Sequence, residues 1–144
     1  MSDLDDATDP PGGWQRQHLQ QYVSTGGAEG HRWHGTTTLL LTTRGRVTGK
    51  ARRTPLIYGR HGDAYLVVAS KGGSRDHPQW YLNLSADPRV RVQVADGVFD
   101  ALARTATPEE KAQLWPVMTA QWPAYDEYQV KTERDIPLVI LTRS

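Results

Sequence analysis

The sequence predicts a single α+β domain in which short, mostly antiparallel strands form a small barrel or sandwich with interspersed helices. About six short runs rich in β-branched residues are separated by turns that contain glycine or proline. The dipeptide Asp96-Gly97 joins two alternating runs, which is typical of a hairpin. The helical segments lack the regular alternation with strands that a parallel, doubly wound sheet requires.

The composition limits the possible chemistry. A chain of 144 residues is long enough for one domain with a substantial core. It contains no cysteine, which excludes disulfides, thiolate catalysis and cysteine-ligated zinc or iron–sulfur sites. No run approaches the roughly 20 apolar residues that cross a bilayer, and the first residues lack a signal-peptide pattern. We therefore expect a cytoplasmic protein without stable membrane insertion.

The charges are unevenly distributed along a chain whose net charge is +1. The N-terminal end is acidic, whereas residues 44–60 contain basic residues and no acidic one. The basic residues are Arg44, Arg46, Lys50, Arg52, Arg53 and Arg60. A local basic patch in a nearly neutral protein favours an anionic small ligand over nucleic acid, although a solvated, solubilising face has the same composition.

The N-terminal third begins with a polar stretch, residues 1–13, that we interpret as a disordered leader. Residues 14–23 have the apolar spacing of a short amphipathic helix, and the glycine-rich residues 24–35 are expected to form a loop or a crossing over the barrel. His31 and His34 lie in that loop. A metal site needs further ligands that the neighbouring sequence does not supply, so we expect exposed loop histidines and no metal.

The first strands are predicted at residues 36–44, 52–58 and 64–70, with connections at 45–50 and 59–63. Pro55 indicates an edge strand or a bulge. The glycine spacing of the 45–50 turn resembles a phosphate loop, but it lacks the Gly-Lys-Ser/Thr ending and joins two strands. We therefore reject a nucleotide-triphosphate site.

A strand, a glycine loop and a helix follow one another over residues 66–84. The paired glycines Gly72 and Gly73, beside Lys71, could bring backbone N–H groups close to an anion. A tight turn with a solvated lysine is the alternative. A helix is expected at about 78–86, with Trp80 and Leu84 on one face.

The C-terminal half continues with strands at 90–95 and 97–105 and a helix over 107–121. Thr107 and the Pro-Glu-Glu that follows it are typical of a helix start, and Pro116 predicts a kink or restart. A second short helix carries Tyr125 and Tyr128, and residues 136–142 form the last strand. Trp122 and these tyrosines recur every third residue, which is the spacing of a core stripe or of a site wall.

Several of these segments together resemble the deazaflavin-dependent nitroreductase family. The likeness is carried by residues 69–73 (Ala-Ser-Lys-Gly-Gly) and 77–84 (His-Pro-Gln-Trp-Tyr-Leu-Asn-Leu). Residues 40–46, 52–56, 122–129 and 135–139 also match in order and spacing, so the likeness covers roughly residues 26–143. The resemblance implies a split, FMN-binding-like β-barrel over residues 36–144, the coenzyme F420, and an N-terminal segment, residues 14–35, that acts as a lid.

The resemblance also implies which residues bind the cofactor. For its phosphate the family uses a basic turn, the arginine after it and the Lys-Gly-Gly loop. The positions implied for the whole cofactor are Arg46, Val47, Thr48, Gly49, Lys50, Arg52, Pro55, Leu56, Ala69, Ser70, Lys71, Gly72, Gly73, Pro78 and Trp80. Val47 departs from the family, which commonly has lysine there. This departure removes one charge-assisted contact, which is worth about 1–3 kcal/mol when fully made, and Lys50 could compensate for it.

The implied reaction is hydride transfer from reduced F420 to a quinone, an enone or a nitroaromatic compound. Ile57, Trp122, Tyr125 and Tyr128 are the expected substrate contacts. Ser70 could donate a hydrogen bond to a substrate oxygen, and Tyr125 or Tyr128 could supply a proton. A homodimer is also expected.

Two alternatives remain at this point. One is a protein that binds or stores F420 without turnover. The other is an FMN-dependent or haem-using relative on the same barrel, because the basic turn would also suit the FMN phosphate. A hydrolase is not indicated, because Ser70 has no obvious histidine and aspartate partners and no surrounding glycine signature.

Overall fold

The computed structural model describes residues 13–33 and 35–144. The predicted leader lies outside these residues except for Gly13, and so does His34, so the interpretations of both stay predictions. The strands are β1 Arg32–Trp33, β2 Thr36–Arg44, β3 Ala51–Ile57, β4 Gly59–His61, β5 Ala64–Val68, β6 Arg89–Val94, β7 Gly97–Thr105 and β8 Leu138–Arg143. The helices are α1 Gly13–Ser24, α2 Gln79–Ala86, α3 Pro108–Gln121 and α4 Ala124–Lys131, with a 3₁₀ turn, η1, at Lys71–Gly73.

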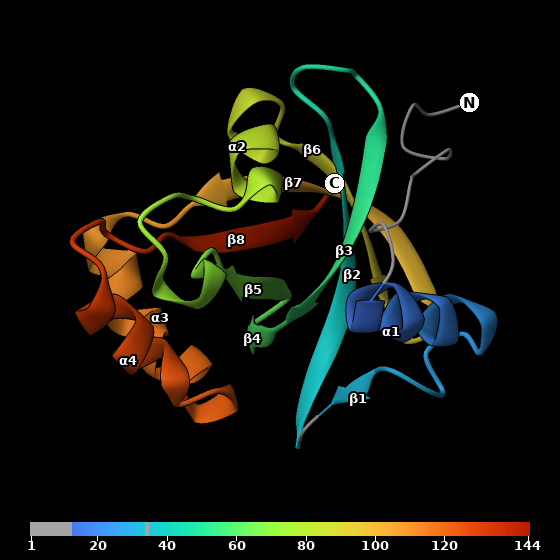
Figure 1. Ribbon diagram of the computed structural model, residues 1–144, viewed down its shortest axis with the longest axis horizontal. Helices are drawn as coiled ribbons and strands as arrows, with labels where there is room; N and C mark the ends of the chain where they lie inside the picture. Colours follow the sequence, from blue (N-terminus) through green and yellow to red (C-terminus); the bar gives the residue numbers. More distant parts are fainter. Residues whose placement is uncertain (1–12, 34) are drawn as a thin grey trace.

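All the strand pairs are antiparallel, and the sheet order is β1-β2-β6-β7-β8-β5-β4, with β3 paired to β2. The sheet curls into a half-barrel (Figure 1). In that view α1 and β1 lie on one side of the long β2–β3 hairpin, and α3 and α4 lie on the other. The α+β class and the antiparallel barrel predicted from the sequence are confirmed.

Strand β5 is buried on both faces at Leu66, Val67 and Val68. Val67 packs into one core cluster with Leu141 of the neighbouring strand β8 and Leu39 of β2. Leu66 and Val68 point to the opposite face and pack under α3 and α4 in a second cluster. A strand buried on both faces must be apolar at consecutive positions, which accounts for the unbroken Leu-Val-Val run.

Helix α1 is attached to the sheet through Tyr22, which is fully buried. The Tyr22 hydroxyl donates to the carbonyl of Thr38 at 2.9 Å and accepts the N–H of Ala95 at 2.6 Å. A Cβ on Gly27 would lie 2.3 Å from the Cα of Ala95, so only glycine allows this approach. The helix and the loop after it are therefore fixed against the turn between β6 and β7.

Three local predictions differ from the structure. The predicted loop over 24–35 contains β1, and the predicted connection over 59–63 contains β4. The β6–β7 hairpin turns at Ala95 and Asp96 rather than at Asp96 and Gly97, because Val94 pairs with Gly97. Ala95 has a positive φ of 54°, a conformation that is uncommon for alanine.

The two proline predictions have different outcomes. Among the described strands β3 pairs only with β2, and Pro55 faces Leu40 in an unbroken register, so Pro55 marks an edge strand and no bulge. Helix α3 continues through Pro116 without a restart. Thr107 caps its start as predicted, and the cap is a capping box, in which Thr107 and Glu110 bond to each other's backbone N–H groups. Within the described residues, no helix is long and apolar enough to cross a membrane.

Candidate functional site

A cavity of about 330 Å³ opens between β3, the end of β5, α2 and α4. Its walls are formed by His18, Trp33, Thr38, Thr54, Pro55, Leu56, Ile57, Val68, Ser70, Lys71, Gly72, Pro78, Trp80, Trp122, Tyr125 and Tyr128. This size and a mainly apolar lining with a few polar groups are typical of a small-molecule site. The structure therefore brings most of the predicted ring and substrate positions to one place.

One wall of the cavity is formed by β3 together with Trp80 of α2. Pro55, Leu56 and Ile57 lie along the edge strand, and Ile57 packs against the cluster under α3 and α4. Trp80 is 8% exposed and belongs to the core cluster inside the sheet. Trp80 is thus both a core residue and a wall of the cavity.

The opposite wall is aromatic and comes from α4 and the residue before it. Trp122, Tyr125 and Tyr128 all face the cavity, as their spacing of three predicts. The indole N–H of Trp122 donates to the Tyr128 hydroxyl at 3.4 Å, and the rings of Tyr125 and Tyr128 lie 6.1 Å apart at 73°. Tyr125 is only 5% exposed, and its burial raises the pKa of the phenol above the usual value of 10. Tyr125 therefore stays protonated at neutral pH.

The N-terminal segment supplies a third wall. Trp33 of β1 stacks on Trp122 with ring centroids 5.5 Å apart and also stacks with His18 of α1, with centroids 6.1 Å apart. Nearby, the Thr36 hydroxyl donates to the Gln121 side chain at 2.9 Å. These contacts join the N-terminal segment to the corner between α3 and α4.

The sequence interpretation missed the residues of this third wall. The signal for Trp33 is an aromatic ring in a polar, glycine-rich segment, which suggests a packing partner elsewhere in the chain. His18 is fixed by its Nε2, which lies 2.7 Å from the carbonyl of Gly30. A carbonyl can only accept, so Nε2 carries the proton in this arrangement.

The loop after β5 lines the cavity with Ser70, Lys71 and Gly72. Three consecutive residues have positive φ, namely Lys71 at 45°, Gly72 at 63° and Gly73 at 79°. A Cβ on Gly73 would lie 2.7 Å from the carbonyl oxygen of Tyr128, so glycine is needed for the loop to approach α4. The space beside Gly72 is open.

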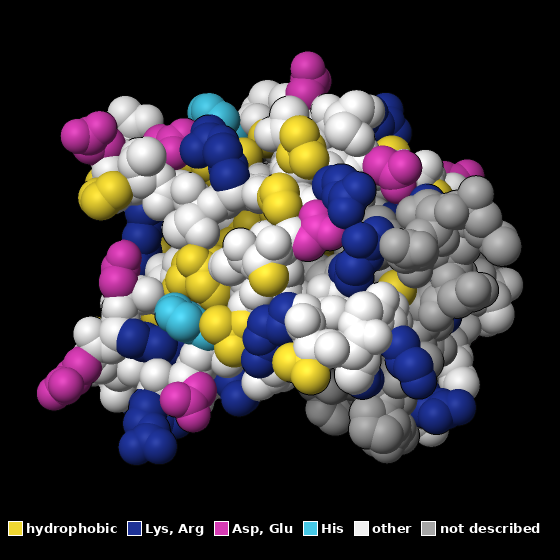
Figure 2. Space-filling view, turned by 90° about the horizontal axis from the view of Figure 1, so that it is seen from above, with side chains coloured by type: hydrophobic (Ala, Val, Ile, Leu, Met, Phe, Trp, Pro, Cys, Tyr) yellow, Lys and Arg dark blue, Asp and Glu magenta, His cyan; other side chains and the backbone are white. Residues whose placement is uncertain are grey.

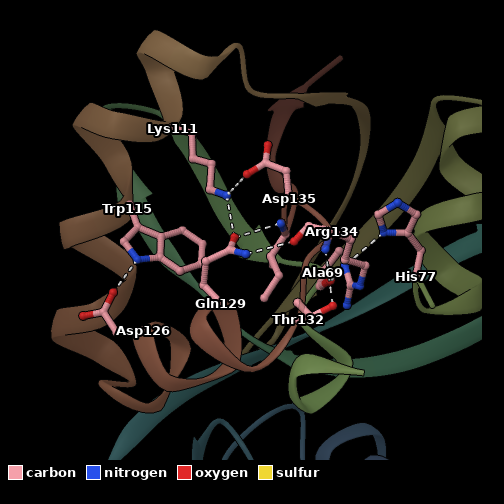
Figure 3. Close-up of polar contacts among 10 residues, drawn as sticks. Ala69, His77, Lys111, Trp115, Asp126, Gln129, Thr132, Arg134 and Asp135 are labelled. Atoms are coloured by element: carbon pink, nitrogen blue, oxygen red, sulfur yellow. Dashed lines mark hydrogen bonds and ion pairs between the residues drawn. The ribbon is translucent and has the colours of Figure 1, made fainter. Parts of the chain in front are cut away.

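The same loop is held from behind by Arg134, which the sequence did not single out. Its Nε donates to the carbonyl of Ser74 at 2.8 Å, and its Nη2 to the carbonyl of Ser70 at 2.6 Å. Its Nη1 lies 3.1 Å from the carbonyl of Ala69 and 3.0 Å from Nδ1 of His77 (Figure 3). Burial lowers the pKa of His77, and the nearby Arg134 charge lowers it further.

A second polar network fixes α4 relative to α3 (Figure 3). Lys111 donates to the side chains of Gln129 at 3.0 Å and Asp135 at 2.5 Å. The Trp115 indole donates to Asp126 at 2.7 Å. The Gln129 side chain also donates to the carbonyl of Arg134 at 2.9 Å. Helix α4 is therefore connected, through Arg134, to the loop after β5.

The basic turn between β2 and β3 does not reach the cavity. It borders a separate hollow of about 430 Å³, which is lined by Arg44, Gly45, Arg46, Val47, Thr48, Gly49, Ala86 and Asp87. The side chain of Arg46 donates to Asn83 and Gln79 of α2, both at 2.9 Å. Val47 is 86% exposed. Figure 2 looks down on this end of the molecule and shows Lys and Arg side chains spread among hydrophobic ones.

The remaining predicted cofactor positions also lie outside the cavity wall. Lys50 and Arg52 are exposed, and Arg52 pairs with Thr43 across the hairpin. Ala69 and Gly73 are buried behind the loop. The residues present fit a flat ring with a charged extension, because an apolar, aromatic cavity bears Lys71 at its edge and a basic turn stands apart from it.

Comparisons with known proteins identify the family to which the chain is similar. The family profile described as F420H(2)-dependent quinone reductase matches residues 14–143. An F420H(2)-dependent quinone reductase of Mycobacterium tuberculosis is 43% identical over 132 residues, which cover 89% of each chain.

Two solved structures share both fold and sequence with the chain. One, described as a domain-swapped dimer, is 38% identical with a TM-score of 0.71, covering 88% of this chain and 95% of the other. The second, an F420-H2 dependent reductase, is 43% identical with a TM-score of 0.67, covering 72% of this chain and 92% of the other.

Proposed function

Because the chain belongs to the F420H(2)-dependent quinone reductase family, we propose that it reduces a quinone in the aromatic cavity. It is an oxidoreductase whose cofactor is coenzyme F420. This assignment favours the main interpretation over a storage protein or an FMN-dependent relative. Enones and nitroaromatic compounds are the other flat, electron-poor acceptors that an aromatic cavity would take.

We assign the cofactor ring to the side of the cavity formed by Pro55, Leu56 and Trp80. The support is that these apolar and aromatic side chains line one wall, with Pro78 beside them. The phosphate then lies toward Lys71 and Gly72, at the cavity edge. The acidic tail extends toward the exposed basic turn, where Arg46, Thr48, Gly49, Lys50 and Arg52 supply charge and polar groups.

The substrate lies against the opposite wall, formed by Ile57, Trp122, Tyr125 and Tyr128. When bound, reduced F420 supplies the hydride, which carries two electrons and one hydrogen. Reduction of a quinone to a quinol needs one further proton. We assign this proton to the Tyr125 phenol, which lines the cavity and is protonated at neutral pH, and the orientation of the acceptor oxygen to the Ser70 hydroxyl. Tyr128 is the second candidate proton donor. Its hydroxyl accepts a hydrogen bond from the Trp122 indole, so its own O–H is not used in that bond and can donate to the substrate.

The N-terminal residues 14–35 act as the lid of this cavity. The supporting observations are that His18 and Trp33 line the cavity and that Trp33 stacks on Trp122. We further propose that the protein is a homodimer and acts in the cytoplasm on a small-molecule substrate. The similar structure described as a domain-swapped dimer supports the first of these.

The observation that carries the proposal is the convergence of Ser70, Tyr125 and Tyr128 on one cavity with an apolar wall opposite. Its test is a pair of titrations, with oxidised F420 and with FMN, followed by quenching of tryptophan fluorescence. We expect tight binding of F420 alone, followed by quinone turnover with the reduced form. Binding of FMN alone would overturn the cofactor assignment, and F420 binding without turnover of any quinone would favour the storage protein.

A further inference from the structure

We propose that Arg134 is a positioning residue that holds the Ser70–Gly73 loop in the shape required to bind the phosphate of the cofactor. The inference rests on the proposed function, which assigns this loop to the cofactor. Arg134 itself is not among the residues that line the cavity. It acts from behind, through the backbone of the loop.

The contacts of Arg134 are concentrated on one short segment. Its guanidinium binds the carbonyls of Ala69, Ser70 and Ser74, with distances of 3.1, 2.6 and 2.8 Å. The contact with His77 Nδ1 at 3.0 Å ties the same side chain to the approach of α2. All three nitrogens of the guanidinium are used, and its planar fork reaches several acceptors that a lysine ammonium cannot bind together.

The loop needs such support because its backbone is unusual. Lys71, Gly72 and Gly73 have positive φ in succession, and Lys71 lacks the freedom of glycine. The N–H groups of Gly73 and Ser74 close the turn on the carbonyls of Ser70 and Lys71, at 2.9 and 3.1 Å. Arg134 binds the Ser70 carbonyl from the other side, so the turn and the arginine fix the same peptide group.

Arg134 is in turn fixed by the helix that carries the substrate wall. Its carbonyl accepts from Gln129 of α4 at 2.9 Å, and Gln129 also accepts from Lys111 at 3.0 Å. Arg134 thus connects the cofactor loop, through its side chain, to the helix that carries the tyrosines, through its backbone carbonyl. Losing the guanidinium fork should loosen the loop and leave the apolar ring wall in place.

The test compares Arg134→Lys with Arg75→Lys. Arg75 lies in the same loop, but its side chain is 93% exposed and its one described ion pair is to Asp76 at 3.9 Å. Both changes keep the charge, so only the loss of the carbonyl contacts distinguishes them. The binding probes are oxidised F420 and the deazaflavin chromophore without phosphate or glutamate tail. Hydrogen exchange of the peptide covering residues 69–77 is measured without cofactor.

We expect Arg134→Lys to weaken F420 binding at least tenfold and to change binding of the phosphate-free chromophore less than twofold. The amides of Gly73 and Ser74 should exchange at least tenfold faster, and Arg75→Lys should change none of these values. His77→Phe, which removes one acceptor and keeps an aromatic ring beside Tyr81, should give a smaller effect in the same direction.

Three outcomes would overturn the inference. One is an F420 affinity of Arg134→Lys that lies within twofold of that of the unmodified protein. Another is an equal loss of affinity for F420 and for the phosphate-free chromophore. The third is unchanged exchange of the loop amides. If the unmodified protein fails to bind F420, the proposed function fails first, and the exchange data still show whether Arg134 holds the loop. If Arg134→Lys does not fold, the decision rests on His77→Phe.

Discussion

The aromatic cavity and the basic turn are built in opposite ways. In the cavity, Tyr125 is almost fully buried, and Trp33, Trp122 and Tyr128 are held by stacking or hydrogen bonds. In the turn, residues 46–50 are all exposed. Only Arg46 is described as reaching another element, through its contacts with α2.

This difference indicates that the cavity and the turn contribute to different steps, the cavity to the reaction and the turn to binding of the cofactor tail. Groups held in a water-poor cavity act with strong local electrostatics and fixed geometry, which suits the reaction and the choice of acceptor. Exposed charges on a turn are screened by salt and contribute little each, which suits a flexible, charged tail. Changes in the cavity should therefore alter turnover strongly, and changes in the turn should alter cofactor affinity weakly.

The largest effect is expected for Tyr125→Phe. Removing a general acid typically costs a factor of 10²–10⁴, so kcat for quinone reduction should fall by about 100-fold or more, with F420 affinity unchanged. Because burial raises the Tyr125 pKa, turnover in the unmodified enzyme should not decline between pH 7 and 9 through loss of this proton. Steady-state kinetics with reduced F420 measures both.

Tyr81→Phe is the control for that change, because the Tyr81 hydroxyl bonds Thr105 at 2.8 Å, outside the cavity wall. If Tyr125→Phe turns over at the rate of the control, Tyr125 is not the proton donor, and Tyr128→Phe becomes the next test.

The second largest effect is expected for Trp33→Ala, which removes the stack on Trp122. The cavity should open on the N-terminal side, and the KM for a two-ring quinone should rise by about tenfold, equivalent to about 1.4 kcal/mol of lost contact. Trp33→Phe keeps an aromatic ring at the position, so its KM should rise less than threefold. Equal KM values for the three proteins would mean that the N-terminal segment does not contact the acceptor.

A smaller effect is expected for Lys50→Ala in the basic turn. The F420 dissociation constant should rise by about threefold at 50 mM salt, and the difference should shrink at 500 mM as the charges are screened. Lys131→Ala, at the exposed end of α4, should leave the affinity unchanged. If Lys50→Ala loses the same F420 affinity at both salt concentrations, the turn binds the cofactor by fixed contacts, and it does not differ from the cavity in this respect.

The smallest effect is expected for Val47→Lys, which restores the residue common in the family. Val47 is 86% exposed, so a lysine fits without disturbing the fold. The F420 dissociation constant should fall by about twofold in the same titration, with kcat unchanged. A change in kcat would contradict the separation of the two regions.

The sequence predicted the elements that depend on local chemistry. The Thr107 cap and the edge position of Pro55 follow from neighbouring residues, and both are confirmed. The family, the cofactor and the barrel followed from motifs in a fixed order, and these are confirmed as well. The roles of the individual site residues stay predictions.

The parts that could not be predicted depend on distant partners. Strand β1 has two residues, Arg32 and Trp33, and exists through pairing with β2. The β6–β7 turn is placed one residue earlier than Asp-Gly suggests, and the Ala95 N–H in it bonds the Tyr22 hydroxyl. Arg134 acts on carbonyls more than 60 positions away, and no local pattern signals such contacts.

The attachment of Tyr22 has a consequence for the order of folding. Its hydroxyl needs the Thr38 carbonyl of β2 and the Ala95 N–H beyond β6, so its partners exist only after those strands have paired. Helix α1 should therefore dock late and detach early, at a lower free energy than global unfolding. Detachment would also free the β1 segment with its Trp33, and the barrel would stay intact while ligands enter and leave.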